Sequence, residues 1–212
     1  TTENDLITSA LLRAKVPLLA EAAKLIADPQ VRYRGTIGGD IAHGDPANDH
    51  PALAIALDAT LVLEGPKGQR GVKAEAFFLG TYSTALADDE ILVAIRVPAL
   101  PAGTGWAYEK LKRKTGDWAT AAAAVVLRQS GGKVTHARIA LTNVGPTALR
   151  AADAEKALLG QPLGDTSIAA AAKAAMAITD PAADLRGDVA YKTAMAGQMV
   201  QRAIRAAAAR CA

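Results

Sequence analysis

The sequence predicts an α+β fold in two parts, residues 1–101 and 102–212. Apolar residues recur at helical spacing near both ends of the chain, whereas several segments between residues 60 and 142 alternate as β-strands do. The segment "ALPAGTG" (99–105), which is rich in glycine and proline, marks the boundary between the parts. We therefore expect helices and a hairpin in the first part, and an antiparallel sheet covered by helices in the second.

The first part is expected to begin with helices. Apolar residues follow helical spacing over residues 3–27 with a break at Pro17, which predicts two short helices. "PALAIALDA" (51–59) predicts another helix, and "TLVLEG" and "QRGVKA" predict a β-hairpin around a turn that contains glycine and proline. "EILVAIRVP" (90–98) alternates as a strand that ends at Pro98, whereas "EAFFLGTYSTAL" (75–86) fits neither pattern.

The second part is expected to form a three-stranded antiparallel sheet with a helical bundle. One strand begins at Trp106, and after a charged loop two further strands are joined at "SGGK" (130–133). Three alanine-rich segments carry leucine, isoleucine or methionine on one side, which predicts packed helices over residues 147–159, 165–178 and 188–210. Asp165, Asp180 and Asp188 are candidate N-cap or turn residues.

Composition limits the classes of function. Hydrophobic residues make up 50% of the 212 residues, enough for a sizeable core, and a net charge of +3 gives no reason to expect nucleic-acid binding. The single cysteine, Cys211, excludes internal disulfides and any iron–sulfur site built by this chain alone. No long apolar segment predicts a membrane span, and we expect a cytoplasmic protein with a small ligand.

One segment has unusual chemistry: "RYRGTIGGDIAHGDPANDHP" (32–51). Gly38 and Gly39 allow a tight turn with positive φ, which would bring backbone amides close to an anion such as a phosphate; a plain structural turn is the alternative. Asp45, Asn48 and Asp49 follow closely and could accept hydrogen bonds from ligand hydroxyls. Amide donors followed by such acceptors indicate a nucleotide-type ligand.

Two other kinds of site compete for these residues. His43, Asp45, Asp49 and His50 are possible metal ligands, but their spacing matches no standard zinc pattern. A serine hydrolase is a weaker alternative because the sequence has no G-x-S-x-G motif, and His136 falls in a predicted strand.

Three segments carry a resemblance to a known family: the motif segment above, "FFLGTYSTALADDEILVAIRVP" and "YEKLKRKTGDWATAAAAVVL". Together they resemble the FAD-binding medium subunit of molybdenum hydroxylases, the carbon monoxide dehydrogenase and xanthine dehydrogenase family. The resemblance implies that residues 1–101 form an FAD-binding α/β subdomain of the vanillyl-alcohol oxidase type, and that residues 102–212 form the C-terminal flavoprotein domain.

The resemblance also implies a set of FAD-binding residues. The family's Thr-Ile-Gly-Gly segment holds the FAD pyrophosphate through backbone amides, an acid further on binds the ribityl chain, and three later residues lie near the flavin ring. In this sequence the corresponding residues are Thr36, Ile37, Gly38, Gly39 and Asp40 for the pyrophosphate, Asp49 for the ribityl chain, and Leu92, Lys110 and Trp118 for the ring.

The charged run "EKLKRKTGD" (109–117) has two interpretations. It is either a solvated strand end or a source of positive potential beside the flavin. We favour the second for Lys110 and the first for Lys114, and we expect Ile91 and Leu92 to form an apolar wall at the ring.

In this family the medium subunit passes electrons from iron–sulfur clusters through FAD to an external acceptor, a quinone or NAD. The implied partners are an iron–sulfur small subunit and a large subunit with the molybdenum cofactor, as a dimer of heterotrimers. The family also has a preceding subdomain with an "AGG-x-S-L-x-P" loop, which these 212 residues do not contain, so we expect the isolated chain to hold FAD weakly. An FAD-free scaffold subunit and a stand-alone flavin oxidoreductase are the alternatives.

Overall fold

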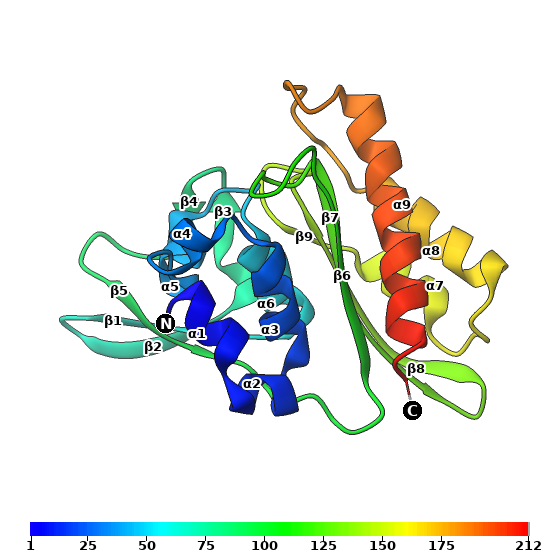
Figure 1. Ribbon diagram of the computed structural model, residues 1–212, viewed down its shortest axis with the longest axis horizontal. Helices are drawn as coiled ribbons and strands as arrows, with labels where there is room; N and C mark the ends of the chain where they lie inside the picture. Colours follow the sequence, from blue (N-terminus) through cyan, green and yellow to red (C-terminus); the bar gives the residue numbers. More distant parts are fainter. Residues whose placement is uncertain (212) are drawn as a thin grey trace.

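The computed structural model describes residues 1–211, and the chain folds into two helical regions on either side of a large antiparallel sheet (Figure 1). The helices of the first part are α1 (Glu3–Thr8), α2 (Ala10–Lys15), α3 (Pro17–Ala22), η1 (Ala23–Leu25), α4 (Pro29–Arg32), α5 (Ile37–His43), α6 (Asp49–Ala56) and η2 (Ala74–Ala76). Its strands are β1 (Thr60–Gly65), β2 (Gly68–Lys73), β3 (Phe78–Gly80), β4 (Ser83–Thr84) and β5 (Ile91–Arg96).

The N-terminal helices are more divided than the apolar spacing predicts. Thr2 and Asp5 form a reciprocal capping box at the start of α1, and the Ser9 hydroxyl accepts a hydrogen bond from the Leu12 amide at the start of α2. Pro17 is the first residue of α3, as its fixed φ favours. Residues 3–27 therefore contain three short α-helices and a 3-10 turn instead of two helices, because Ser9 starts a new helix.

The predicted hairpin is confirmed. β1 and β2 pair antiparallel around the turn at Gly65 and Gly68, and β5 pairs antiparallel with the other edge of β1, which gives the strand order β2-β1-β5. The segment 75–86, which fits neither a helix pattern nor a strand pattern, contains the end of the 3-10 turn η2 and the two-stranded β3–β4 sheet. This small sheet layer borders the N-terminal helices (Figure 1).

The second part contains the large sheet and three helices. Its elements are β6 (Gly105–Leu111), β7 (Ala121–Ser130), β8 (Lys133–Thr142), β9 (Leu149–Arg150), α7 (Ala152–Leu158), α8 (Asp165–Met176) and α9 (Val189–Ala208). The strand order is β6-β7-β8-β9, antiparallel throughout. The expected antiparallel sheet is confirmed, and a fourth strand, β9, extends it. Because residues 149–150 pair with β8, the helix expected from residue 147 begins only at Ala152.

The large sheet has helices on both faces, which explains the apolar character of β7. Ala122, Ala124 and Val126 face a core shared with the first part, whereas Val125 and Leu127 face α7–α9. A strand that is buried on both faces has a continuous run of apolar residues in its sequence, instead of alternating apolar and polar residues. The sheet is therefore the wall between two cores.

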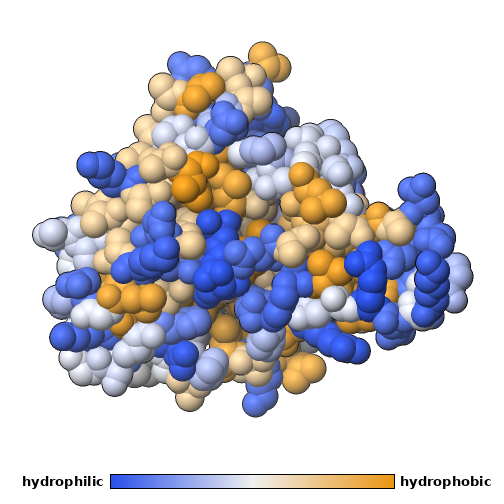
Figure 2. Space-filling model, turned by 180° about the vertical axis from the view of Figure 1, so that it is seen from behind, coloured by the Kyte–Doolittle hydropathy of each residue, from blue (hydrophilic) through white to orange (hydrophobic). Residues whose placement is uncertain are grey.

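The helices α7–α9 cover the outer face of the sheet (Figure 1). Asp188 caps α9 as predicted, since its side chain accepts a hydrogen bond from the Tyr191 amide at 2.7 Å, whereas Asp165 is the first residue of α8 and Gly164 is the cap. α9 lies close to β6: a Cβ on Gly105 would stand 1.9 Å from the carbonyl oxygen of Ala207. Within residues 1–211, no helix has the length and apolarity needed to cross a membrane. Figure 2 shows that on the reverse face hydrophobic side chains lie in small groups among hydrophilic ones.

Candidate functional site

The Thr-Ile-Gly-Gly segment begins a helix, and the expectation of a tight turn with positive φ was wrong. Thr36 is the N-cap of α5, and its Oγ1 accepts a hydrogen bond from the Gly39 amide at 3.1 Å. Gly38 and Gly39 lie in the first helical turn, whereas the positive φ is found at Gly44 (67°), where α5 ends. A threonine N-cap satisfies a first-turn amide and so favours a helix start over a turn.

The first turn of α5 leaves one amide free. The Ile37 amide donates to the carbonyl oxygen of Thr1 at 3.1 Å, and the Gly39 amide donates to the Thr36 hydroxyl. The Gly38 amide has no acceptor among residues 1–211, and a Cβ added to Gly38 would meet nothing within 4 Å. An unpaired amide at the start of a helix, next to open space, is suited to an anionic oxygen.

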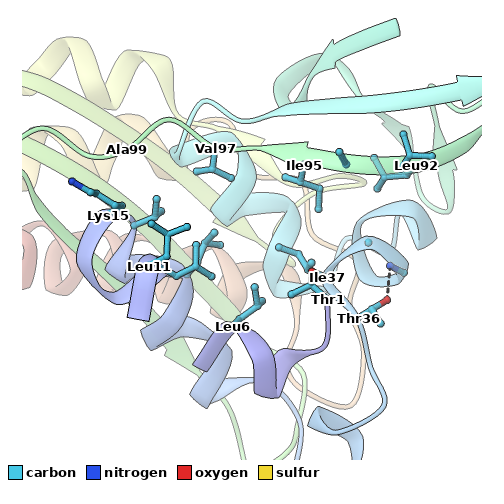
Figure 3. Close-up of a pocket in the computed structure, with 17 residues that line it drawn as sticks. Thr1, Leu6, Leu11, Lys15, Thr36, Ile37, Leu92, Ile95, Val97 and Ala99 are labelled. Carbon is cyan, nitrogen blue, oxygen red and sulfur yellow. Dashed lines mark hydrogen bonds between the residues drawn. The ribbon is translucent and has the colours of Figure 1, made fainter. Parts of the chain in front are cut away.

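This turn lies at one end of a cleft of about 670 Å³ (Figure 3). One wall comes from the N-terminal helices, with Leu6 and Leu11, and the opposite wall comes from β5. Five of the predicted site residues line it: Thr36, Ile37, Gly38, Gly39 and Leu92. Ile91, expected beside Leu92 in an apolar wall, does not line this cleft and is 70% exposed.

The other predicted site residues meet in a second cleft of about 220 Å³. They are Asp40, Asp49, Lys110 and Trp118. Gly39 lines the first cleft and its neighbour Asp40 lines the second, so the start of α5 lies between the two. The structure thus brings the nine predicted residues close to α5 but divides them between two clefts, and the charged ones among them, Asp40, Asp49 and Lys110, all line the second.

Asp49 and Lys110 form a buried ion pair in the second cleft. The Lys110 ammonium contacts Asp49 Oδ2 at 2.6 Å, with side-chain exposures of 2% and 5%, and the Tyr108 hydroxyl donates to Asp49 Oδ1. Burial, followed by the Asp49 charge, raises the pKa of Tyr108 well above its ordinary value, so the phenol stays protonated. Lys110 therefore neutralises Asp49 instead of adding free positive potential, while Lys114 is exposed as predicted.

A second buried pair, which the sequence did not predict, lies behind the first. His50 is fully buried, and its Nε2 contacts both carboxylate oxygens of Glu3 at 2.9 Å. Burial opposes protonation of His50, but the hydrogen bond to Glu3 and the charges of Asp40 and other carboxylates outweigh it, so the pKa of His50 is raised. His50 was identified only as a possible metal ligand, and nothing near Glu3 in the sequence marks it as a partner.

Within residues 1–211, the Asp40 side chain makes fewer hydrogen bonds than the side chains of the neighbouring acids Glu3 and Asp49. Its Oδ2 accepts one long hydrogen bond, 3.3 Å from the His50 amide. Burial raises the pKa of Asp40 from 3.8 to about 6, and the nearby carboxylates of Asp49 and Glu3 add to the rise. The second cleft therefore contains an acid that titrates close to neutral pH.

The metal-site alternative receives no support from the geometry. Among residues 1–211 no three or more histidine, cysteine, aspartate or glutamate side chains are grouped as metal ligands. His43 Nδ1 lies 3.3 Å from the side-chain amide nitrogen of Asn48. The Asp45 carboxylate accepts hydrogen bonds from the backbone amide of Ala47 and from the Tyr82 hydroxyl. These side chains stabilise the loop after α5 and do not converge.

Two family models match this chain. Residues 1–100 match the family model described as the FAD binding domain in molybdopterin dehydrogenase, and residues 106–207 match the CO dehydrogenase flavoprotein C-terminal domain.

Individual relatives match over the whole chain. The carbon monoxide dehydrogenase medium chain of Hydrogenophaga pseudoflava is 68% identical over 212 residues, which are 100% of this chain and 74% of that protein. The medium chain of Afipia carboxidovorans is 53% identical over 99% of this chain and 73% of its own length. A solved structure of the Hydrogenophaga pseudoflava enzyme, in a form that lacks the Mo-pyranopterin moiety, matches with a TM-score of 0.99 and 71% identity, over 100% of this chain and 74% of that chain.

Both family models, the identity to these relatives and the shared fold lead to one conclusion. The chain belongs to the family of FAD-binding medium subunits of molybdenum hydroxylases, which includes the carbon monoxide dehydrogenase medium chains.

Proposed function

We propose that this chain is the flavoprotein subunit of a carbon monoxide dehydrogenase, and that it binds FAD across the two clefts beside α5. The residues beside α5 would hold FAD, and the cofactor would supply electron transfer between iron–sulfur clusters of a partner subunit and an external acceptor, a quinone or NAD. The observation that carries the proposal is the Gly38 amide, which has no acceptor within residues 1–211 and faces open space at the end of the larger cleft.

The residues present fit the chemical groups of FAD. The amide of Gly38 suits a pyrophosphate oxygen, because helix-start amides bind anions and no side chain blocks the approach. Leu92 and the other apolar residues of the larger cleft suit an apolar part of the cofactor. The Asp49–Lys110 pair and Trp118 supply polar and aromatic contacts in the smaller cleft. Asp49 has both oxygens occupied, so any ribityl hydroxyl would share them with Tyr108 and Lys110.

The proposed partners follow from what the described chain lacks. Residues 1–211 contain one free cysteine and no cluster of metal ligands, so the electron donor has to be another subunit. We propose an iron–sulfur small subunit and a large subunit with the molybdenum cofactor, assembled as a dimer of heterotrimers in the cytoplasm. Within this chain we propose residues 1–101 as the FAD-binding subdomain and 102–212 as the C-terminal domain.

The test is a methyl group placed where the pyrophosphate would lie. Gly38→Ala adds one carbon in open space inside a helical turn, where alanine has a higher helix propensity than glycine. We expect the variant to unfold at the same temperature as the wild type or a higher one, while its FAD content, measured by visible absorbance of the purified complex, falls. Gly164→Ala, at an equally open glycine at the start of α8, is the matched control and should retain its FAD.

The result separates the alternatives. Full FAD content in Gly38→Ala would contradict binding at α5. A wild-type complex that contains no flavin would favour the scaffold subunit.

A further inference from the structure

The loop between α8 and α9, residues 177–188, is fastened to α9 by a buried lysine. Lys192 lies on α9 with its side chain 2% exposed, and its ammonium donates to the carbonyl oxygen of Ala182 at 2.8 Å and contacts Asp184 Oδ1 at 3.0 Å. A buried lysine is costly unless its charge is paired. Both of these contacts of the ammonium are to residues of the loop.

Asp184 in turn fixes the backbone at Arg186. Its Oδ1 accepts a hydrogen bond from the Arg186 amide at 2.8 Å, and the backbones of Asp184 and Gly187 exchange two hydrogen bonds of 3.1 Å. A Cβ at Gly187 would stand 2.5 Å from the Tyr191 ring, so the chain can pass there only as glycine. The direction in which Arg186 leaves the loop is therefore set by Lys192 and Asp184.

Arg186 then reaches the β6–β7 loop, which lies at the same end of the large sheet (Figure 1). Its NH2 donates to Asp117 Oδ1 at 2.8 Å, and its guanidinium lies 5.9 Å from the centre of the Trp118 ring. Asp117 is 5% exposed at its side chain and also accepts hydrogen bonds from Arg113 Nε at 3.0 Å and from the Trp118 amide at 2.9 Å. Hydrogen bonds from Arg186 and Arg113 outweigh desolvation and lower the pKa of Asp117 to about 2, so the acceptor is always charged at neutral pH.

These contacts hold Trp118 from one side only. Its ring is 52% exposed and lines the smaller cleft with Asp49 and Lys110. Without the contacts to Asp117 and Arg186, a tryptophan at the end of a loop would sample several rotamers. Within residues 1–211, the Arg186 guanidinium lies over the Trp118 ring, whereas Asp117 contacts the Trp118 backbone amide.

We propose that Arg186 is a positioning residue for the flavin site, acting through Asp117 to hold Trp118 against the ring, with Lys192 anchoring the loop that presents it. The inference rests on the proposed function, in which FAD extends into the smaller cleft that Trp118 lines, and it takes Trp118 as a contact to the flavin ring, as the family resemblance implies. It assigns a role in the cofactor site to the loop between the last two helices, which is 69 residues from Asp117 in the sequence.

The first measurement needs no flavin. The chain has two tryptophans, so a Trp106→Phe background leaves Trp118 as the single fluorophore. In this background we expect Arg186→Gln to lower the fluorescence anisotropy of Trp118 and to raise its quenching by acrylamide. Arg205→Gln is the matched control, since it removes an Arg–Asp pair of 2.9 Å on α9 away from the cleft, and it should change neither signal.

The second measurement is made on the assembled complex. Arg186→Gln should weaken FAD binding by about tenfold, the size expected for losing a charge-assisted contact, and should shift the visible flavin spectrum. Arg186→Lys, which keeps the charge, should restore part of the affinity. If Arg186 acts through Asp117, then Asp117→Asn should add little to the effect of Arg186→Gln, whereas independent residues would add fully.

The outcomes separate this inference from the proposed function. Unchanged Trp118 anisotropy in Arg186→Gln overturns the positioning role. Lower anisotropy with unchanged FAD affinity and flavin spectrum also overturns it, because Trp118 would then be positioned for something else, while the Gly38→Ala result still supports FAD binding. If Gly38→Ala leaves the FAD content unchanged, the proposed function itself fails.

Discussion

Replacing Asp40 with asparagine is expected to stabilise the protein at neutral and alkaline pH. Asp40 is enclosed near two other carboxylates, Glu3 and Asp49, and within residues 1–211 its side chain accepts only the 3.3 Å hydrogen bond from the His50 amide. Burial raises the pKa of Asp40 from 3.8 to about 6. The folded protein therefore pays a free-energy cost to ionise this residue, and asparagine removes that cost.

The sign and size follow from proton binding. Between pH 3.8 and about 6 the folded state binds more protons at Asp40 than the unfolded state does, so the free energy of unfolding falls as pH rises through this window. One pKa unit corresponds to about 1.4 kcal/mol, so the full rise amounts to about 3 kcal/mol. The attraction of His50 is already included, because it lowers the pKa of Asp40 in the folded state.

The assay is urea unfolding of the wild type and Asp40→Asn at pH 4 and pH 8. At pH 4 Asp40 is protonated in the folded protein, and the two proteins should have similar free energies of unfolding. At pH 8 the variant should be more stable by up to about 3 kcal/mol. Asp88→Asn is the control, since Asp88 is exposed and its side chain has no hydrogen-bond partner in the described chain.

Two results would refute this reasoning. One is a variant that is less stable than the wild type at pH 8, which would mean that the charge of Asp40 is needed by His50. The other is a difference of the same size at both pH values, which would mean that the substitution acts through packing and not through ionisation.

Three further variants test the buried contacts. In urea unfolding, Asp49→Asn should lower the free energy of unfolding by about 3–5 kcal/mol, because it leaves the Lys110 ammonium buried without a counter-charge. Adding Lys110→Met should recover most of this loss. A double variant as unstable as Asp49→Asn alone would contradict the prediction. Gly105→Ala should lower the free energy of unfolding by about 3 kcal/mol or more, because its Cβ would collide with the Ala207 carbonyl. In thermal unfolding the melting temperature of Gly105→Ala should fall, whereas that of the control Gly164→Ala should change little. Equal melting temperatures for Gly105→Ala and the wild type would show that α9 can move away from β6. Lys192→Met should make the loop 177–188 more sensitive to trypsin at Arg186, and an unchanged cleavage rate would mean that the loop does not depend on the buried ammonium.

The secondary structure could be predicted where periodicity and end signals agree. The β1–β2 hairpin combines two strand patterns with a glycine turn, and α9 combines an apolar stripe with the Asp188 cap. The start of α5 could not be predicted, because the low helix propensity of Gly38 and Gly39 favours a turn, whereas the N-cap at Thr36 favours a helix. β9 is only two residues long and has no pattern of its own.

The site residues came from a resemblance, and their arrangement was beyond the sequence. Lys110 is 61 residues from Asp49, and His50 is 47 residues from Glu3, so no local spacing indicates that either pair is in contact. A lysine within a run of charged residues is predicted to be exposed to solvent. Only the structure, which brings Lys110 of β6 to Asp49 at the start of α6, shows that Lys110 is buried and neutralised.

The alanines at the start of β7 have a consequence for the alignment of the sheet. Ala121–Ala124 are identical side chains that alternate between the two cores, so sliding a neighbouring strand along them by one residue would meet the same surface. These four alanines therefore do not specify the register in which a neighbouring strand pairs with β7. A slip of one residue in β6 would nevertheless turn Lys110, now opposite Ala122, to the other face of the sheet and leave Asp49 without its counter-charge. The Asp49–Lys110 ion pair therefore favours one register of β6 against β7, which the four alanines do not specify.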